Sequence, residues 1–133
     1  SSRFLSLIDL SDVLLDPIYF GGGLSFAESM VIGTPTITMP NKFMRSSITA
    51  GAYKQMKIED PPIVDNIDDY VNLAVSLAKD KKGNFNYRDK LKKAAKLYLY
   101  NDQNAVRKFE KFLFDANEAS KKNTYLKSGH IIS

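Results

Sequence analysis

Apolar positions along the chain follow two different periods. Near the start, Phe4-Leu5-x-Leu7-Ile8 repeats at helical spacing and predicts a short opening helix. Short apolar runs at 13–15 and 36–39 are bounded by polar residues or proline and predict two buried strands. Between them, 25–32 predicts a helix that ends at Gly33, where a left-handed cap is easy. The centre therefore predicts a βαβ unit with parallel strands and a right-handed crossover.

The rest of the chain is mainly helical in pattern. Pro61-Pro62 interrupts it, and Ile63-Val64 predicts a short third strand. Asp65 or Asn66 is expected to cap the helix that follows. The predicted helices cover 45–56, 66–79, 84–99 and 102–119. Residues 121–133 show no periodicity and are expected to form a flexible tail.

This combination of elements is unusual for a free-standing α/β domain. A doubly wound sheet normally has more than two or three parallel strands, with helices on both faces. The chain also opens in a predicted helix rather than in a first strand. We therefore expect an α/β fold that is the C-terminal part of a longer Rossmann-like domain. It has a small parallel sheet, several helices and a helix-rich C-terminus, with the domain over 1–120 and the tail over 121–133.

Composition excludes several kinds of chemistry. The chain has 133 residues, no cysteine and one histidine. Disulfides, thiolate metal sites, a cysteine nucleophile and a site with several histidines are therefore excluded, and we expect no metal. His130 falls in the predicted tail and is not expected to be functional. No apolar run approaches the roughly 18–20 residues of a membrane helix, and the N-terminus lacks a signal-peptide pattern, so we expect a cytoplasmic protein.

Charge is distributed unevenly. Residues 1–78 carry a formal charge of −4 and residues 79–133 carry +8. The lysines between 90 and 96 alternate with Leu91, Ala94 and Ala95, which is typical of the solvated face of an amphipathic helix. Clustered arginines with interleaved aromatic residues are missing, so no specific nucleic-acid partner is expected. Aromatic residues at helical spacing are interpreted as core or interface packing: Tyr98, Tyr100, Phe109, Phe112 and Phe114.

Candidate chemistry gathers where the first strand meets the following helix. Gly21-Gly22-Gly23 lies there, and glycines allow a backbone to approach a ligand closely. The helix N-terminus adds unpaired N–H groups and a positive dipole end, which together suit phosphate. The spacing matches neither the Walker loop nor the dinucleotide fingerprint. A phosphate site and a merely tight turn therefore both remain open.

Three charged residues near this loop each allow two interpretations. Glu28, one turn into the helix, could accept hydrogen bonds from sugar hydroxyls, or it could close a capping box with Ser25. Arg45 could bind phosphate bidentately, or it could be a surface arginine. Asp16 before Pro17 is better explained as a turn former or loop cap than as an acid catalyst.

These motifs together resemble a known enzyme family. The stretch from Asp16 to Arg45 is similar to the C-terminal catalytic region of SPINDLY-type O-linked N-acetylglucosamine transferases. The motifs that carry the similarity are Asp16-Pro17-x-x-Phe20-Gly21-Gly22-Gly23, Glu28, Gly33-Thr34-Pro35, Thr38-Met39-Pro40 and Phe43-Met44-Arg45. The resemblance implies a GT-B fold and a UDP-sugar site. It implies that Gly22, Gly23, Leu24 and Ser25 hold the diphosphate, with Leu24 acting through its backbone N–H, and that Glu28 holds the ribose.

The resemblance also implies an activity for the intact enzyme. That enzyme would transfer N-acetylglucosamine, or a related sugar, from UDP to a protein Ser/Thr hydroxyl with inversion and without a cofactor. We expect the acceptor-binding half and the general base to lie outside this chain, so the chain alone is expected to be inactive. A truncated sheet could also self-associate. The alternative is a non-catalytic interaction domain that docks partners through its basic C-terminal helices.

Overall fold

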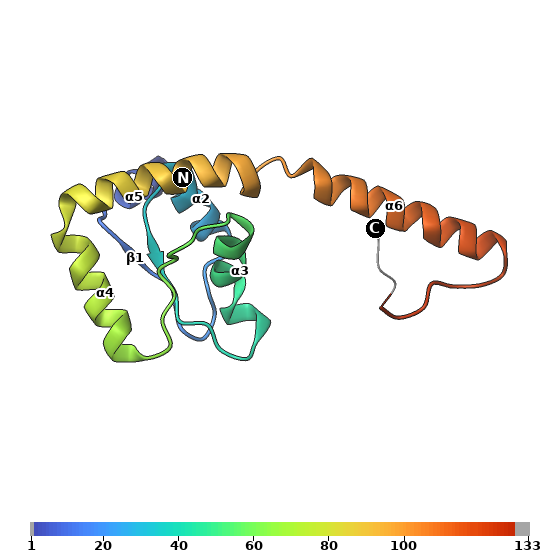
Figure 1. Cartoon of the computed structure of the whole chain (residues 1–133), viewed down its shortest axis with the longest axis horizontal. Helices are drawn as coiled ribbons and strands as arrows, with labels where there is room; N and C mark the ends of the chain where they lie inside the picture. The colour runs from blue at the N-terminus through green and yellow to red at the C-terminus, as the bar shows by residue number, and fades with distance from the viewer. Residues whose placement is uncertain (1, 130–133) are drawn as a thin grey trace. The chain divides into compact units, whose positions relative to one another are not determined.

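The computed structural model describes residues 2–129 and divides into two compact units (Figure 1). The first ends at Tyr100 and contains the sheet and most of the helices, whereas the second begins at Asn101. His130 lies outside the described residues. The division falls within the predicted domain of 1–120, whose boundary stays a prediction.

A small parallel sheet lies at the centre of the first unit. Strand β1 (Leu14–Leu15) pairs with β2 (Thr36–Ile37) in parallel, with Leu14 opposite Thr36 and Leu15 opposite Ile37. The predicted third strand is present only as an isolated parallel bridge between Thr38 and Ile63. Pro61 and Pro62 precede this bridge and have no backbone N–H to extend the ladder. The prediction of two or three parallel strands is therefore confirmed with two strands.

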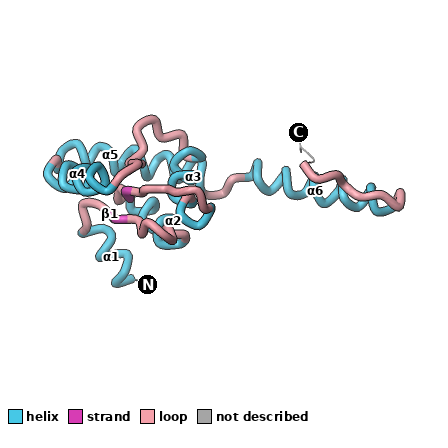
Figure 2. The backbone as a smooth tube through the Cα atoms, turned by 90° about the horizontal axis from the view of Figure 1, so that it is seen from below, coloured by secondary structure: helices cyan, strands magenta, loops and turns pink. Residues whose placement is uncertain are grey.

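Helices surround these strands. Figure 2 shows α1 on one side of the strands and α4 on the other. The helical elements of the first unit are α1 (Ser2–Leu10), α2 (Leu24–Ile32), the 3₁₀ turn η1 (Met44–Ser46), α3 (Ile48–Gln55), α4 (Ile67–Lys79), α5 (Lys81–Ala94) and the π-helical turn η2 (Ala95–Leu99). Helix α2 packs against α1 and α5, and α4 packs against α5 and β2.

Caps explain where the helices begin and end. Gly33 ends α2 in the left-handed conformation, with φ of 83°, as predicted. The Asn66 side chain caps α4 by accepting a hydrogen bond from the N–H of Asp69 at 2.9 Å. The prediction that the next helix begins at residue 84 is wrong, because Asp80 accepts from the N–H of Gly83 at 2.9 Å and starts α5 at Lys81. The predicted helix over 45–56 is divided into η1 and α3.

The core of the first unit lies between α2, α3 and α5. Its buried members are Phe26, Met30, Tyr53, Met56, Ile58, Leu91 and Ala95. The rings of Phe26 and Tyr53 meet edge to face, with centroids 5.3 Å apart. The Tyr53 hydroxyl accepts from the N–H of Thr36 at 2.9 Å and donates to its carbonyl at 3.0 Å. This one side chain therefore satisfies both backbone groups that Thr36 turns away from β1.

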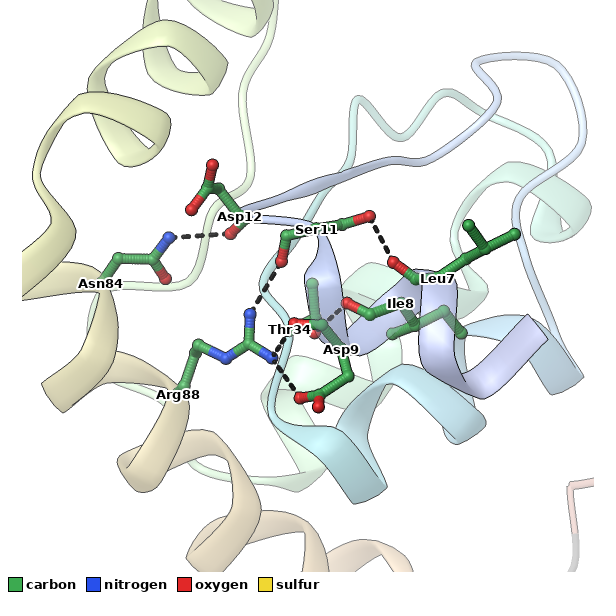
Figure 3. A network of polar contacts seen from close by, with 8 residues as sticks. All are labelled: Leu7, Ile8, Asp9, Ser11, Asp12, Thr34, Asn84 and Arg88. Atoms are coloured by element: carbon green, nitrogen blue, oxygen red, sulfur yellow. Dashed lines mark hydrogen bonds and ion pairs between the residues drawn. The ribbon is translucent and has the colours of Figure 1, made fainter. Parts of the chain in front are cut away.

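A polar network fastens the segment between α1 and β1 to α5 (Figure 3). The Arg88 guanidinium donates to the carbonyls of Ser11 at 2.7 Å and Asp9 at 3.2 Å. Asn84 donates from Nδ2 to the carbonyl of Asp12 at 2.8 Å. These bonds satisfy carbonyls at the C-terminus of α1 and place β1 at a fixed distance from α5.

The second unit is built on one long helix. Asp102 caps α6 (Gln103–Lys121) by accepting from the N–H of Asn104 at 3.0 Å. Phe109 and Phe112 stack with ring centroids 6.4 Å apart, and both are exposed, as is Phe114. The interpretation of these three phenylalanines as core packing does not hold within the second unit, where they are exposed, and their interpretation as interface packing stays a prediction. None of the described helices is long and apolar enough to cross a membrane.

Candidate functional site

The glycine loop connects the carboxyl end of β1 to the N-terminus of α2. In open parallel sheets, ligands bind outside the carboxyl ends of the strands. The N–H of Gly21 donates to the carbonyl of Arg45 at 2.8 Å, so the loop is tied to η1. The structure therefore brings together the three segments that the motif analysis singled out: the loop, the start of α2 and Arg45.

Asp16 sits beneath this loop and is almost completely buried. Its Oδ1 accepts from the N–H of Gly22 at 2.6 Å, and its Oδ2 accepts from the hydroxyl of Thr38 at 2.7 Å. Its carbonyl accepts from the Tyr70 hydroxyl at 2.7 Å. Burial first, and the charge of Asp16 second, raise the pKa of Tyr70, which keeps this hydroxyl protonated and able to donate. The interpretation of Asp16 as a loop cap is confirmed.

The first turn of α2 leaves backbone donors open. Gly23 is the N-cap and has no side chain to satisfy the helix amides. Within residues 2–129, no group accepts from the N–H groups of Gly23, Leu24 or Ser25. The Leu24 side chain is 76% exposed. The neighbouring N–H of Gly22 differs, because Asp16 already occupies it. Three adjacent amides at a positive helix end can therefore bind an anion.

Glu28 does not form the capping box. Helix α2 begins at Leu24 with Gly23 as its cap, so Ser25 is the second helical residue and cannot act as the N-cap partner of Glu28. Glu28 is half-buried, and no hydrogen bond or ion pair joins its carboxylate to another of the described residues. It lies four residues after Leu24, on the same face of α2. Its carboxylate is therefore free to accept hydrogen bonds from a ligand.

Arg45 is held beside the loop by three contacts. Its Nε donates to the carbonyl of Tyr19 at 3.2 Å, and its guanidinium lies 4.6 Å from the centre of the Phe43 ring. Its own carbonyl accepts from Gly21. The side chain is exposed, so its remaining guanidinium nitrogens can reach a ligand in solvent. The structure thus gives Arg45 a defined place next to the loop, and its binding of phosphate stays a prediction.

Exposed apolar side chains border the same loop, and sequence reasoning missed them as a group. All of them lie within the loop, at the start of α2 or around η1: Tyr19, Phe20, Leu24, Phe43 and Met44. The signal that could have found them is their position, because each flanks either the glycine run or Arg45 in the sequence. Large apolar groups beside open backbone donors are typical of ligand-binding surfaces.

Within residues 2–129, several basic residues of the C-terminal half form ion pairs with acidic side chains, unlike Arg45. On α5, Lys81 pairs with Asp12 at 2.6 Å and Lys93 with Asp89 at 2.8 Å. On α6, Arg107 pairs with Glu110 at 2.6 Å. These pairs spread along exposed helix faces, which agrees with the prediction of a solvated amphipathic helix. Among the residues that the structure describes, no group of acidic or histidine side chains could hold a metal ion.

Comparison with known proteins identifies the fold. No family model matches the chain, and no curated protein matches it. A solved structure of a mutant O-GlcNAc transferase from Thermobaculum terrenum aligns with 79% of this chain, with a TM-score of 0.68 and 19% sequence identity. The two chains share a fold. It is a helix-rich α/β fold of the GT-B type with a small parallel sheet, as predicted. The chain spans 20% of the length of that transferase chain.

Proposed function

We propose that this chain is the nucleotide-sugar-binding portion of a glycosyltransferase of the SPINDLY-type O-linked N-acetylglucosamine transferase group. In the full-length enzyme, N-acetylglucosamine would pass from UDP to a protein Ser/Thr hydroxyl. The acceptor-binding part and the general base would come from outside this chain, so the chain alone would bind the donor without turnover.

One observation carries this proposal. The open N–H groups of Gly23, Leu24 and Ser25 and the free carboxylate of Glu28 lie on the first turns of one helix, beside the carboxyl end of a parallel strand. The amides suit the diphosphate of a nucleotide sugar, because they are preorganised donors at a positive helix end. The Glu28 carboxylate, one turn further along, suits the ribose hydroxyls, because both of its oxygens accept hydrogen bonds.

Arg45 and Gly22 complete the proposed diphosphate site. In the proposed complex, the guanidinium of Arg45 stabilises the phosphate charge bidentately, as the charge on the departing UDP develops. Gly22 contributes by its lack of a side chain rather than by its N–H, which remains bonded to Asp16. The donor diphosphate is thus bound by helix amides and one arginine, with no metal ion required of this chain.

A titration of the ¹⁵N-labelled chain with UDP tests the proposal. We expect backbone amide signals of residues 21–28 and of Arg45 to shift in a saturable way, whereas those of α6 stay in place. Uridine, which lacks the phosphates, is the matched control ligand and is expected to shift these amides far less. Signals in 21–28 that do not respond to UDP would contradict the proposal. A silent loop together with a partner that binds the C-terminal helices would favour the interaction domain.

A further inference from the structure

The buried carboxylate of Asp16 bonds to two segments that lie far apart in the sequence. One oxygen accepts from the loop at Gly22 and the other from the strand end at Thr38, 22 residues away. The backbone of Asp16 is fixed as well, because its N–H donates to the carbonyl of Ile37 at 2.9 Å and its carbonyl accepts from Tyr70. Both oxygens of the side chain therefore have fixed directions, and the loop takes its position from them.

The same carboxylate determines which backbone donors of the loop face a ligand. By accepting from Gly22 at 2.6 Å, it turns that N–H inward and away from solvent. The next three N–H groups, those of Gly23, Leu24 and Ser25, have no acceptor among the residues of the described chain. A loop without this bond would be free to reorient, and the three amides would no longer be held in one arrangement. Preorganised donors bind an anion more tightly than donors that must first be ordered.

The close approach of the loop to Asp16 also explains a glycine. A Cβ built on Gly21 would lie 3.1 Å from Oδ2 of Asp16 and 3.4 Å from the carbonyl of Arg45. It would be pressed between a carboxylate with two hydrogen bonds and a backbone that itself bonds to Gly21. Only glycine fits this position without displacing one of them. The contact between Asp16 and Gly21 therefore sets the distance of the loop from the strand ends.

We propose that Asp16 is a positioning residue for nucleotide-sugar binding: its carboxylate holds the glycine loop so that the N–H groups of Gly23, Leu24 and Ser25 converge on the diphosphate. This inference rests on the proposed function and adds to it a residue that does not touch the ligand. Its charge is directed inward, toward Gly22 and Thr38, so it acts through the loop.

The test compares Asp16→Asn with Tyr70→Phe in the same chain. Asparagine keeps the shape of the side chain but loses the charge, and its amide group would face the Thr38 hydroxyl, which now donates to Asp16. Tyr70→Phe is the matched control, because it removes the bond to the Asp16 carbonyl and leaves the carboxylate contacts in place. For each variant, calorimetry measures the affinity for UDP and NMR measures the chemical shift of the Gly22 amide proton.

We expect Asp16→Asn to weaken UDP binding by about tenfold or more, because the loop loses a charge-assisted bond. The Gly22 amide proton is expected to move upfield in this variant as its bond weakens. In Tyr70→Phe, both the affinity and the Gly22 shift are expected to stay close to those of the parent chain. A loss of affinity in Asp16→Asn no larger than that in Tyr70→Phe would overturn the positioning role.

Two further outcomes are decisive. If Asp16→Asn does not fold, Thr38→Val is tested in its place. This variant removes the hydrogen-bond partner of Asp16 Oδ2. Unchanged UDP affinity in Thr38→Val would overturn the proposal. A parent chain that does not bind UDP would contradict the proposed function and this inference together. A parent that binds UDP, with equal affinity in Asp16→Asn, would overturn the positioning role alone.

Discussion

Arg45 and Tyr19 hold the two sides of the candidate site together. The Nε of Arg45 donates to the carbonyl of Tyr19 at 3.2 Å, although the two residues are 26 positions apart. Because the carbonyl of Arg45 also accepts from Gly21, the glycine loop and η1 are joined by two bonds. The guanidinium is thereby placed at the loop before any ligand arrives, which reduces the entropy cost of using it to bind phosphate.

Removing this cation is expected to weaken phosphate binding selectively. Arg45→Gln is expected to reduce UDP affinity by roughly threefold to tenfold, because a charge-assisted bond at an exposed site is partly screened by water. Affinity for uridine is expected to change little, since uridine has no phosphate. Calorimetry with both ligands measures the difference, and Arg107→Gln on α6 is the matched arginine control. Equal losses for UDP and uridine would show that Arg45 supports the loop rather than the phosphates.

Glu28 is expected to recognise hydroxyl groups. Glu28→Gln replaces one carboxylate oxygen with an NH₂ group and loses a charge-assisted hydrogen bond, which is worth roughly 1.5–3 kcal/mol, or about tenfold or more in affinity. The 2′,3′-dideoxy analogue of UDP has no ribose hydroxyls to bind. We therefore expect the substitution to weaken UDP strongly and the dideoxy analogue hardly at all. If both nucleotides bind variant and parent alike, Glu28 has no part in the site.

The Tyr53 hydroxyl is expected to stabilise the fold. Tyr53→Phe leaves the buried N–H and carbonyl of Thr36 without their partner, so the free energy of unfolding is expected to fall by about 1–3 kcal/mol. Urea denaturation followed by circular dichroism measures this change. Tyr125→Phe is the matched control, because Tyr125 is exposed, and its effect is expected to stay within about 0.5 kcal/mol. Similar midpoints for both variants would contradict the role of the Tyr53 hydroxyl.

Stability is expected to fall under alkaline conditions. Burial raises the pKa of Tyr53, and burial together with the charge of Asp16 raises that of Tyr70, above the ordinary value of 10.0. Above about pH 10 the unfolded chain releases these protons while the folded chain retains them, so the folded state binds more protons. The free energy of unfolding must then decrease as pH rises. Urea midpoints at increasing pH measure it, and a midpoint that stays constant or rises above pH 10 would contradict the assignment.

Local patterns were sufficient to predict the centre of the fold. The apolar runs before Asp16 and after Pro35, with a helix between them, predicted the parallel pair β1 and β2. Gly33 was predicted as a left-handed cap because only glycine adopts that conformation readily. Both features follow from short local patterns in the sequence. The start of α5 was missed because Lys81, Lys82 and Gly83 carry no apolar period, and only the Asp80 cap shows that they are helical.

The arrangement of the site depended on contacts across long intervals. Asp16 has the pattern of a turn residue, and nothing near it in sequence indicates that Thr38 and Tyr70 would bond to it. Ser25 and Glu28 have the spacing of a capping box, yet Gly23 caps the helix and leaves Glu28 free, because helix α2 begins one residue earlier than predicted. The glycine loop was found from sequence, but which of its N–H groups are open was decided by tertiary structure.

The most direct test of the account compares two glycine substitutions by calorimetry with UDP. An ideal Cβ meets no atom within 4 Å at either Gly23 or Gly51, so there is open space for a Cβ at both positions. At Gly23, however, a valine side chain would stand beside the amides proposed to bind the diphosphate, whereas Gly51 lies in α3. We predict that Gly23→Val abolishes UDP binding with its helical content retained, and that Gly51→Val binds UDP like the parent chain. Equal affinity of the two variants for UDP would contradict the account.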